Sequence, residues 1–383
     1  MRNKKISLLL LAGITLPLFA ATILPMNRAF LAVTDLLPFI HDQPSFMDKK
    51  NEAVIKQKLK ELNTAMKSAK HETMLQHDLF APSYSLITEN VNEVVNAFNA
   101  GKKSYAHWTL GELTSLCLDC HTRLPESHSS SFQNGELRVD ETKLKDPFTL
   151  GMAHLIVRRY VDAKNSFTRD IQDKLIKKDF NELKAPFQQI LLIETKILKD
   201  PASMELIIDS YMKKELMPQS MKTILSQWKE RLTYWKNAPI LQKGLQSEND
   251  LKQFFKTRLI PLKQINVFEE GHKVDLLLTS GILSNYFFFN QDTSHAAEIS
   301  YWMGWLEKRL KREDFFGAGD YFLKQCIRKY PKHPIAKECL KEYKESIEFD
   351  FSGSSGTNIP TEVEEEIDEL DRLLGPKTKP LKQ

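Results

Sequence analysis

The sequence predicts an all-α protein with two helical regions joined by a polar segment. Apolar side chains recur every three to four residues along most of the chain, which is the spacing of one face of an amphipathic helix. Glycine is scarce, with 14 residues in 383, and strand-like alternation bounded by hairpin turns is weak throughout. The net charge of +4 is close to neutral for this length, so the composition does not favour a nucleic-acid partner.

The N-terminal residues 1–28 have the pattern of a signal peptide or an N-terminal signal anchor. Residues 1–5 carry positive charge, and residues 6–24 are almost wholly apolar. This apolar run is longer than that of most cleaved signals and close to the length that spans a bilayer, so we favour an anchor over cleavage. The positive end should stay in the cytoplasm, which places the rest of the chain outside it.

Three amphipathic helices are expected within residues 45–130. The first covers residues 49–70, the second follows Pro82 and ends at Gly101, and the third runs from about residue 106 to 125. Each has one apolar face. The sequence therefore predicts a short helical bundle in this region.

Cys117, Cys120 and His121 form the pattern C-x-x-C-H, which is the attachment motif of haem c. Cysteines at positions i and i+3 of a helix face the same side, so both thiols can form thioethers with one haem. His121 is then held near the iron as its proximal axial ligand. Both cysteines lie on the apolar stripe of the third helix, so one covalent haem is expected where core side chains meet.

Three other interpretations of this motif stay open. A C-x-x-C pair can be a redox dithiol, but that chemistry needs a βαβ context, and the residues before Cys117 have helical spacing. Zinc usually needs about four ligands, and the other two cysteines, Cys326 and Cys339, are distant in the sequence. The third is coincidence, with two buried thiols and a surface histidine. The export pattern favours haem attachment over all three.

The haem region resembles the class II cytochromes c, the cytochrome c-prime group, in which the haem motif ends the last helix of a four-helix bundle. The resemblance rests on the late, helical motif at residues 117–121. The order of residues after His121 departs from the one common in that family. A first bundle helix is not obvious either, so the bundle is short or residues 30–46 complete it.

The sixth iron ligand is the least determined feature of the haem region. The resemblance implies either a methionine from the first helix or an open coordination site. Met66 and Met47 are the candidate ligands, although core packing is the favoured role of Met66. Methionine ligation suits electron transfer, whereas an open site suits gas or peroxide. Arg123 is expected to be a solvated surface charge rather than a partner of the haem propionates.

Residues 145–350 are expected to form an array of helical hairpins that resembles the tetratricopeptide repeat (TPR). Gly151, Ala163 and Phe167 match the spacing of the small and large positions of that repeat. A second, imperfect match begins at Gly304, and the segment between is helical with few matches. Such arrays stack into a concave surface that usually binds protein.

Cys326 and Cys339 lie on two expected helices of this region, separated by a turn at residues 330–334. A helix hairpin brings the two side chains together. An oxidising compartment favours a disulfide between them over two buried thiols.

Residues 351–383 are expected to form a flexible linker followed by an acidic amphipathic helix. A short helix with one apolar face must dock on another surface, or it remains only marginally stable. Docking on a partner, docking on the repeat region and a frayed tail all stay open.

These features predict a monohaem c-type cytochrome of the bacterial periplasm, soluble or anchored to the inner membrane. Its expected function is electron transfer to a redox partner protein, without enzymatic turnover. The TPR-like region and the C-terminal helix are expected to contact a protein complex. Two alternatives stay open: a scaffold or assembly protein with a structural or sensory haem, and an open-site haem that binds gas or peroxide.

Overall fold

The computed structural model describes residues 18–125, 139–264, 269–312, 315, 317–354 and 356–375. These residues confirm the all-α class, with one short two-stranded hairpin as the exception. Residues 1–17 of the predicted signal and residues 126–131 of the predicted linker lie outside the described residues. In the described part of the chain, no helix is long and apolar enough to cross a membrane.

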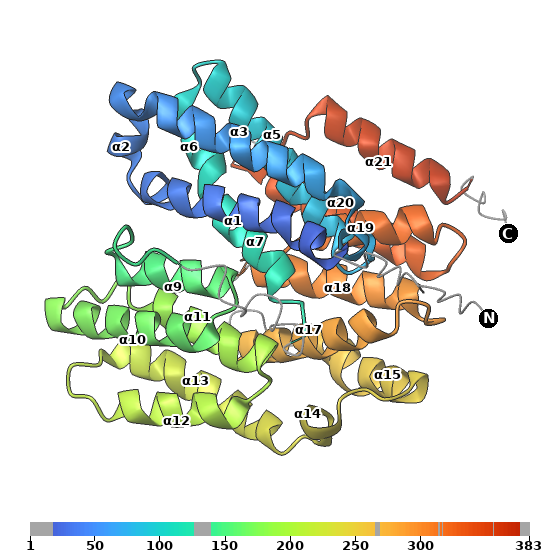
Figure 1. Ribbon diagram of the computed structural model, residues 1–383. Helices are drawn as coiled ribbons and strands as arrows, with labels where there is room; N and C mark the ends of the chain where they lie inside the picture. Colours follow the sequence, from blue (N-terminus) through green and yellow to red (C-terminus); the bar gives the residue numbers. More distant parts are fainter. Residues whose placement is uncertain are drawn as a thin grey trace, which may run out of the picture.

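The helices before residue 126 pack as a bundle in the upper half of Figure 1. Their bounds are α1 (Leu18–His41), α2 (Gln43–Met47), η1 (Lys49–Asn51), α3 (Glu52–Ser68), η2 (Ala69–His71), α4 (Thr73–Gln76), α5 (Ala81–Asn99), α6 (Lys103–Gly111) and α7 (Leu113–His121). Helix α1 packs along α3 and also contacts α2 and α6. It buries one apolar face, which includes Phe30, Val33 and Leu37, so α1 supplies the first helix of the bundle.

The third helix expected from the sequence is two helices in the structure, α6 and α7, which meet at Glu112. Gly111 directly precedes the break, and glycine has the lowest helix propensity after proline. The break lets the two helices contact different neighbours. Both helices contact α5, but α6 also contacts α1 and α2, whereas α7 also contacts α9.

Many of the helices after residue 139 pack against the next helix in the sequence, and together they continue below and beside the bundle (Figure 1). Their bounds are α9 (Pro147–Ile156), α10 (Tyr160–Lys177), α11 (Lys184–Leu192), η4 (Ile193–Ile197), α12 (Pro201–Met212), α13 (Gln219–Lys236), α14 (Pro239–Lys243), α15 (Glu248–Phe254), η5 (Phe255–Leu259), α16 (Ile260–Leu262), α17 (His272–Phe289), α18 (Ala296–Arg312), α19 (Gly319–Lys329) and α20 (Ile335–Asp350). Helix α17 contacts η4, α13 and α18, and it is buried along nearly its whole length. It is therefore the central helix of this region.

Aspartate side chains cap the N-termini of two of these helices. The Asp146 carboxylate accepts a hydrogen bond from the Thr149 backbone N–H at 2.8 Å, and Asp200 accepts one from Ser203 at 3.0 Å. In both cases a proline follows, at the first helical position, where its missing N–H costs nothing. These local signals place the starts of α9 and α12.

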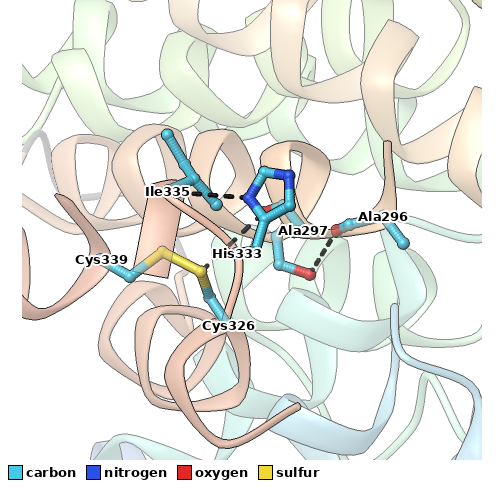
Figure 2. Close-up of a disulfide and its surroundings, with 7 residues drawn as sticks. Ala296, Ala297, Cys326, His333, Ile335 and Cys339 are labelled. Atoms are coloured by element: carbon cyan, nitrogen blue, oxygen red, sulfur yellow. Dashed lines mark hydrogen bonds between the residues drawn. A yellow bond between two sulfur atoms is a disulfide. The ribbon is translucent and has the colours of Figure 1, made fainter. Parts of the chain in front are cut away.

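Figure 2 shows the disulfide between Cys326 on α19 and Cys339 on α20. The two Cα atoms are 6.4 Å apart, and both side chains are fully buried. The bond closes the α19–α20 hairpin, whose turn is held by a hydrogen bond from the Ile335 N–H to His333 Nδ1 at 3.2 Å. The disulfide expected between these cysteines is thus present.

The C-terminal segment folds back onto the chain. After the hairpin of β1 (Ser352–Gly353) and β2 (Gly356–Thr357), α21 (Thr361–Leu373) packs on α19 and α20. Leu370 is fully buried there. Glu366 accepts a hydrogen bond from the Tyr343 hydroxyl at 2.8 Å and pairs with Lys324 at 3.1 Å. Apolar burial and charge pairing therefore both hold α21 against its own chain.

Candidate functional site

The three side chains of the C-x-x-C-H motif line one apolar cavity between α1, α3 and α7. Cys117, Cys120 and His121 contribute from the C-terminal half of α7, and Met26 and Met66 contribute from α1 and α3. The cavity has a volume of about 40 Å³. The structure therefore gathers two thiols, an imidazole and two thioethers around a single apolar space.

The His121 ring is oriented by the helix that follows the motif. Its Nδ1 lies 2.5 Å from the carbonyl oxygen of Ile156, the last residue of α9. A carbonyl only accepts, so this contact assigns the proton to Nδ1 and the lone pair to Nε2. Burial lowers the pKa of His121 to about 4, so the ring is neutral near pH 7. A neutral imidazole with one nitrogen held by a carbonyl is the form that ligates iron.

The two motif cysteines are unfavourable as redox nucleophiles. They form no disulfide with each other, and burial raises the pKa of both thiols to about 12. Reactive dithiols instead have a lowered pKa, because the thiolate is the nucleophile. Across the described ranges, no group of three or more His, Cys, Asp or Glu side chains is placed to hold a metal ion. The raised pKa values of the two thiols weigh against the dithiol interpretation of the motif.

The structure separates the two methionines named from the sequence. Met66 lies on α3, is 3% exposed and lines the cavity, and the Tyr84 hydroxyl donates to its backbone carbonyl at 2.7 Å. Met47 lies on α2, partly buried against the core, and is not among the cavity-lining residues. Met26 on α1 lines the cavity and was missed from the sequence. Its signal was the apolar stripe that continues from Met26 through Phe30 and Val33 beyond the export pattern.

The side chains around the cavity suit haem c in chemistry, and the cavity must widen to admit the ring. Two cysteines, a neutral histidine and a methionine are the groups that attach and ligate this cofactor. Pockets for ligands of that size have volumes of about 300–1,000 Å³, against about 40 Å³ here. Binding of haem would therefore require the helices that enclose the cavity to move apart.

A buried charge cluster holds the end of α7 in place. The Arg123 guanidinium donates to the carboxylate of Asp119 and, at 2.5 Å, to the Ser83 hydroxyl oxygen on α5. It also lies 3.7 Å from Glu307 on α18, which pairs with Lys196 of η4 at 2.9 Å. The expectation that Arg123 is a surface charge is wrong, since its side chain is fully buried.

Opposite charges explain how this cluster tolerates burial. Burial alone would lower the pKa of Arg123, but the carboxylates of Asp119 and Glu307 raise it. Burial alone would raise the pKa of Glu307, but Lys196 and Arg123 outweigh that effect and lower it. The opposite charges therefore keep both Arg123 and Glu307 charged near pH 7 although neither is exposed to solvent.

A second arginine, Arg158, fixes the chain just after the motif. Its guanidinium donates to the backbone carbonyls of Leu124 and Pro125, both at 2.8 Å, and to the Tyr160 hydroxyl oxygen at 2.6 Å. Arg158 is 1% exposed. The turn between α9 and α10 is thereby attached to the segment that follows the C-x-x-C-H motif, a relationship that the sequence pattern did not indicate.

The chain matches no protein-family model, no curated protein and no solved structure. The interpretation of the site therefore depends on its residues and their geometry.

Proposed function

We propose that the protein is a monohaem c-type cytochrome that transfers electrons in the bacterial periplasm. The observation that carries this proposal is the convergence of Cys117, Cys120 and His121 on one apolar cavity that Met26 and Met66 also line. Attachment by two cysteines and ligation by histidine are the chemistry that this pattern serves.

Each residue has a distinct task in this proposal. Cys117 and Cys120 hold the cofactor covalently, and His121 ligates the iron through Nε2 while Ile156 keeps the ring oriented. The apolar wall limits water around the site, which together with the axial ligands sets the redox potential. The bound haem supplies an iron that cycles between two oxidation states. No bond to a substrate is made, so the expected function is that of a carrier and not of an enzyme.

The disulfide and the N-terminal pattern support a location in the periplasm. Disulfides persist in oxidising spaces, and the Cys326–Cys339 bond fits the periplasm that haem attachment of this kind also requires. The apolar N-terminal run supports export, with the chain either released or kept at the inner membrane.

Helix packing after residue 145 supports a TPR-like, partner-binding region. A Cβ atom at Gly151 would lie 2.5 Å from the Phe167 ring, so the small residue allows α9 and α10 to pack closely. Gly304 on α18 meets Leu323 on α19 in the same way, at 2.7 Å. Close helix hairpins of this kind are the unit of such repeats. In this proposal the region binds the redox partner or a complex containing it.

One observation favours a second candidate function, a scaffold whose haem is structural or sensory. The motif helix is joined to α18 and η4 by the buried contacts of Arg123, Glu307 and Lys196. A change of ligation at the haem would therefore act directly on the partner-binding region. Fast, reversible exchange of electrons with a soluble cytochrome supports the carrier. Slow reduction combined with tight partner binding supports the scaffold.

Spectra of the protein produced with haem-maturation machinery test the proposal. We expect a haem spectrum that survives denaturation and organic extraction, because thioether bonds do not break under those conditions. The double variant Cys117→Ala/Cys120→Ala should lose it. The matched control, Cys326→Ala/Cys339→Ala, removes the other two cysteines and should retain it. Absence of covalent haem from the unmodified protein would refute the proposal.

The distal ligand is tested by the same spectra with and without carbon monoxide. Methionine ligation predicts a low-spin haem that does not bind carbon monoxide until that methionine is replaced. Met26→Leu and Met66→Leu are the informative variants because both side chains line the cavity, and Met47→Leu is the control. A high-spin haem that binds carbon monoxide in the unmodified protein supports the open-site alternative.

A further inference from the structure

A charged groove runs along the outer side of the bundle between α3 and α5. It has a volume of about 250 Å³, and it is lined by Lys56, Leu59, Lys60, Asn63, Thr64, Lys67, Val95, Phe98 and Asn99. Leu59, Val95 and Phe98 form an apolar floor, while the lysines lie along one rim. The opposite face of α3 carries Met66 and lines the haem cavity, so the groove is a separate surface.

The positive charge of this groove is not neutralised by the chain itself. Lys56, Lys60 and Lys67 form no ion pair with any described residue, and no acidic side chain lines the groove. The nearest acids on α3 are engaged elsewhere. Glu52 pairs with Lys103 at 2.8 Å, and Glu61 pairs with Lys58 at 2.9 Å. The groove therefore attracts an anionic ligand.

The groove also contains a polar atom that needs a donor. The Asn63 side-chain oxygen is buried and accepts no hydrogen bond from any described residue. A buried acceptor without a donor costs free energy, and a bound group with an N–H or O–H restores the missing hydrogen bond. Sulfate and chloride offer no such donor, whereas a polypeptide offers backbone and side-chain N–H groups.

The spacing of the lysines decides the size of the ligand. Lys56 and Lys67 are eleven residues apart on α3, which is about 16 Å along a helix. One small anion cannot reach both ammonium groups, but carboxylates spread along a helix or an extended segment can. We propose that this groove binds an acidic, amphipathic segment of a partner protein, with apolar side chains on Phe98 and Val95 and carboxylates at the lysine rim. The surface does not depend on haem, so it goes beyond the function proposed above.

Binding of a defined peptide to the full-length protein tests this proposal. The probe is a fluorescent peptide of 18 residues with glutamates at positions i, i+4 and i+11 and leucines on the adjoining face. A matched peptide with glutamine in place of glutamate measures the contribution of charge. Carbodiimide coupling, which joins carboxylates to amines, followed by mass spectrometry identifies the lysines in contact.

The test variant is Lys56→Gln/Lys60→Gln/Lys67→Gln. The matched control is Lys213→Gln/Lys252→Gln/Lys256→Gln, which removes three other exposed lysines and the same charge. We expect the groove variant to weaken binding of the glutamate peptide by about tenfold. The control variant should bind within about twofold of the unmodified protein. Cross-links should map to Lys56, Lys60 or Lys67.

Three results would overturn the proposal. Equal weakening by both triple variants would mean that the peptide responds only to net charge. Equal affinity for the glutamate and glutamine peptides would mean that the lysines do not contribute to binding through charge. Citrate that displaces the peptide at the same carboxylate concentration would point to a site for small anions. Because the probe requires no haem, each result stands apart from the outcome of the haem spectra.

Discussion

The guanidinium of Arg123 lies 3.7 Å from the carboxylate of Glu307, and both side chains are fully buried. Arg123 lies two residues after the C-x-x-C-H motif, whereas Glu307 belongs to α18 in the second helical region. Ser280 on α17 adds a hydrogen bond to Glu307 at 2.6 Å. The two helical regions therefore share a charged core in addition to their apolar contacts.

Removing one member of this cluster should destabilise the whole chain. Glu307→Ala leaves Arg123 and Lys196 buried with one carboxylate fewer, and uncompensated buried charges cost about 3–5 kcal/mol. The free energy of unfolding, measured by urea titration, should fall by that amount. Glu61→Ala removes half of an exposed pair with Lys58 and should cost less than about 1 kcal/mol. If both variants lose the same unfolding free energy, the buried cluster contributes no more to stability than an exposed ion pair.

The disulfide should stabilise the α19–α20 hairpin. Cys326 and Cys339 are separated by 13 residues, and closing a loop of that size in the unfolded chain is worth about 3 kcal/mol. The double variant Cys326→Ala/Cys339→Ala should therefore unfold at a lower urea concentration than the oxidised protein. Reducing the unmodified protein should have a comparable effect. No change on reduction would contradict the prediction.

Acid should weaken the fold through His272. This side chain is 2% exposed, and both ring nitrogens are buried without a hydrogen-bond partner among the described residues. Burial lowers its pKa to about 4, from an ordinary value of 6.5. Between those values the unfolded chain binds a proton that the folded chain does not, so stability is complete above pH 6.5 and falls towards pH 4.

The corresponding variant is His272→Leu. Leucine has a similar size, is apolar and cannot titrate. Over the same pH range the variant should lose about 3 kcal/mol less unfolding free energy than the unmodified protein. Urea titrations at pH 7, 5.5 and 4.5 measure how steeply the unfolding free energy of each protein depends on pH. If the unfolding free energies of the two proteins depend on pH equally, His272 does not titrate between pH 4 and pH 6.5.

Helices with a regular apolar stripe were predictable from the sequence. The stripe over residues 49–70 corresponds to α3 and its two short flanking helices, because Ile55, Leu59 and Leu62 repeat at helical spacing and are buried. The expected helix after Pro82 corresponds to α5 for the same reason. Helix α1 was less apparent, because its apolar face merges with the apolar run of the export pattern.

The contacts that hold the candidate site depend on residues far apart in the chain. Arg123 had the appearance of a surface charge because its partner Glu307 lies in another helical region, and no local pattern indicates such a pair. The Ile156 carbonyl that orients His121 is likewise a backbone group, which carries no sequence signal. The residue types of the motif were therefore readable from the sequence, whereas the groups that position them were not.

The most direct test of the central proposal is the mass of the proteolytic peptide that contains residues 117–121. The protein is isolated from cells that mature c-type cytochromes, denatured, digested and analysed by tandem mass spectrometry. The proposal predicts one peptide that carries the mass of a single haem, with both Cys117 and Cys120 modified. The same peptide with two free thiols, or with a Cys117–Cys120 disulfide, would contradict it.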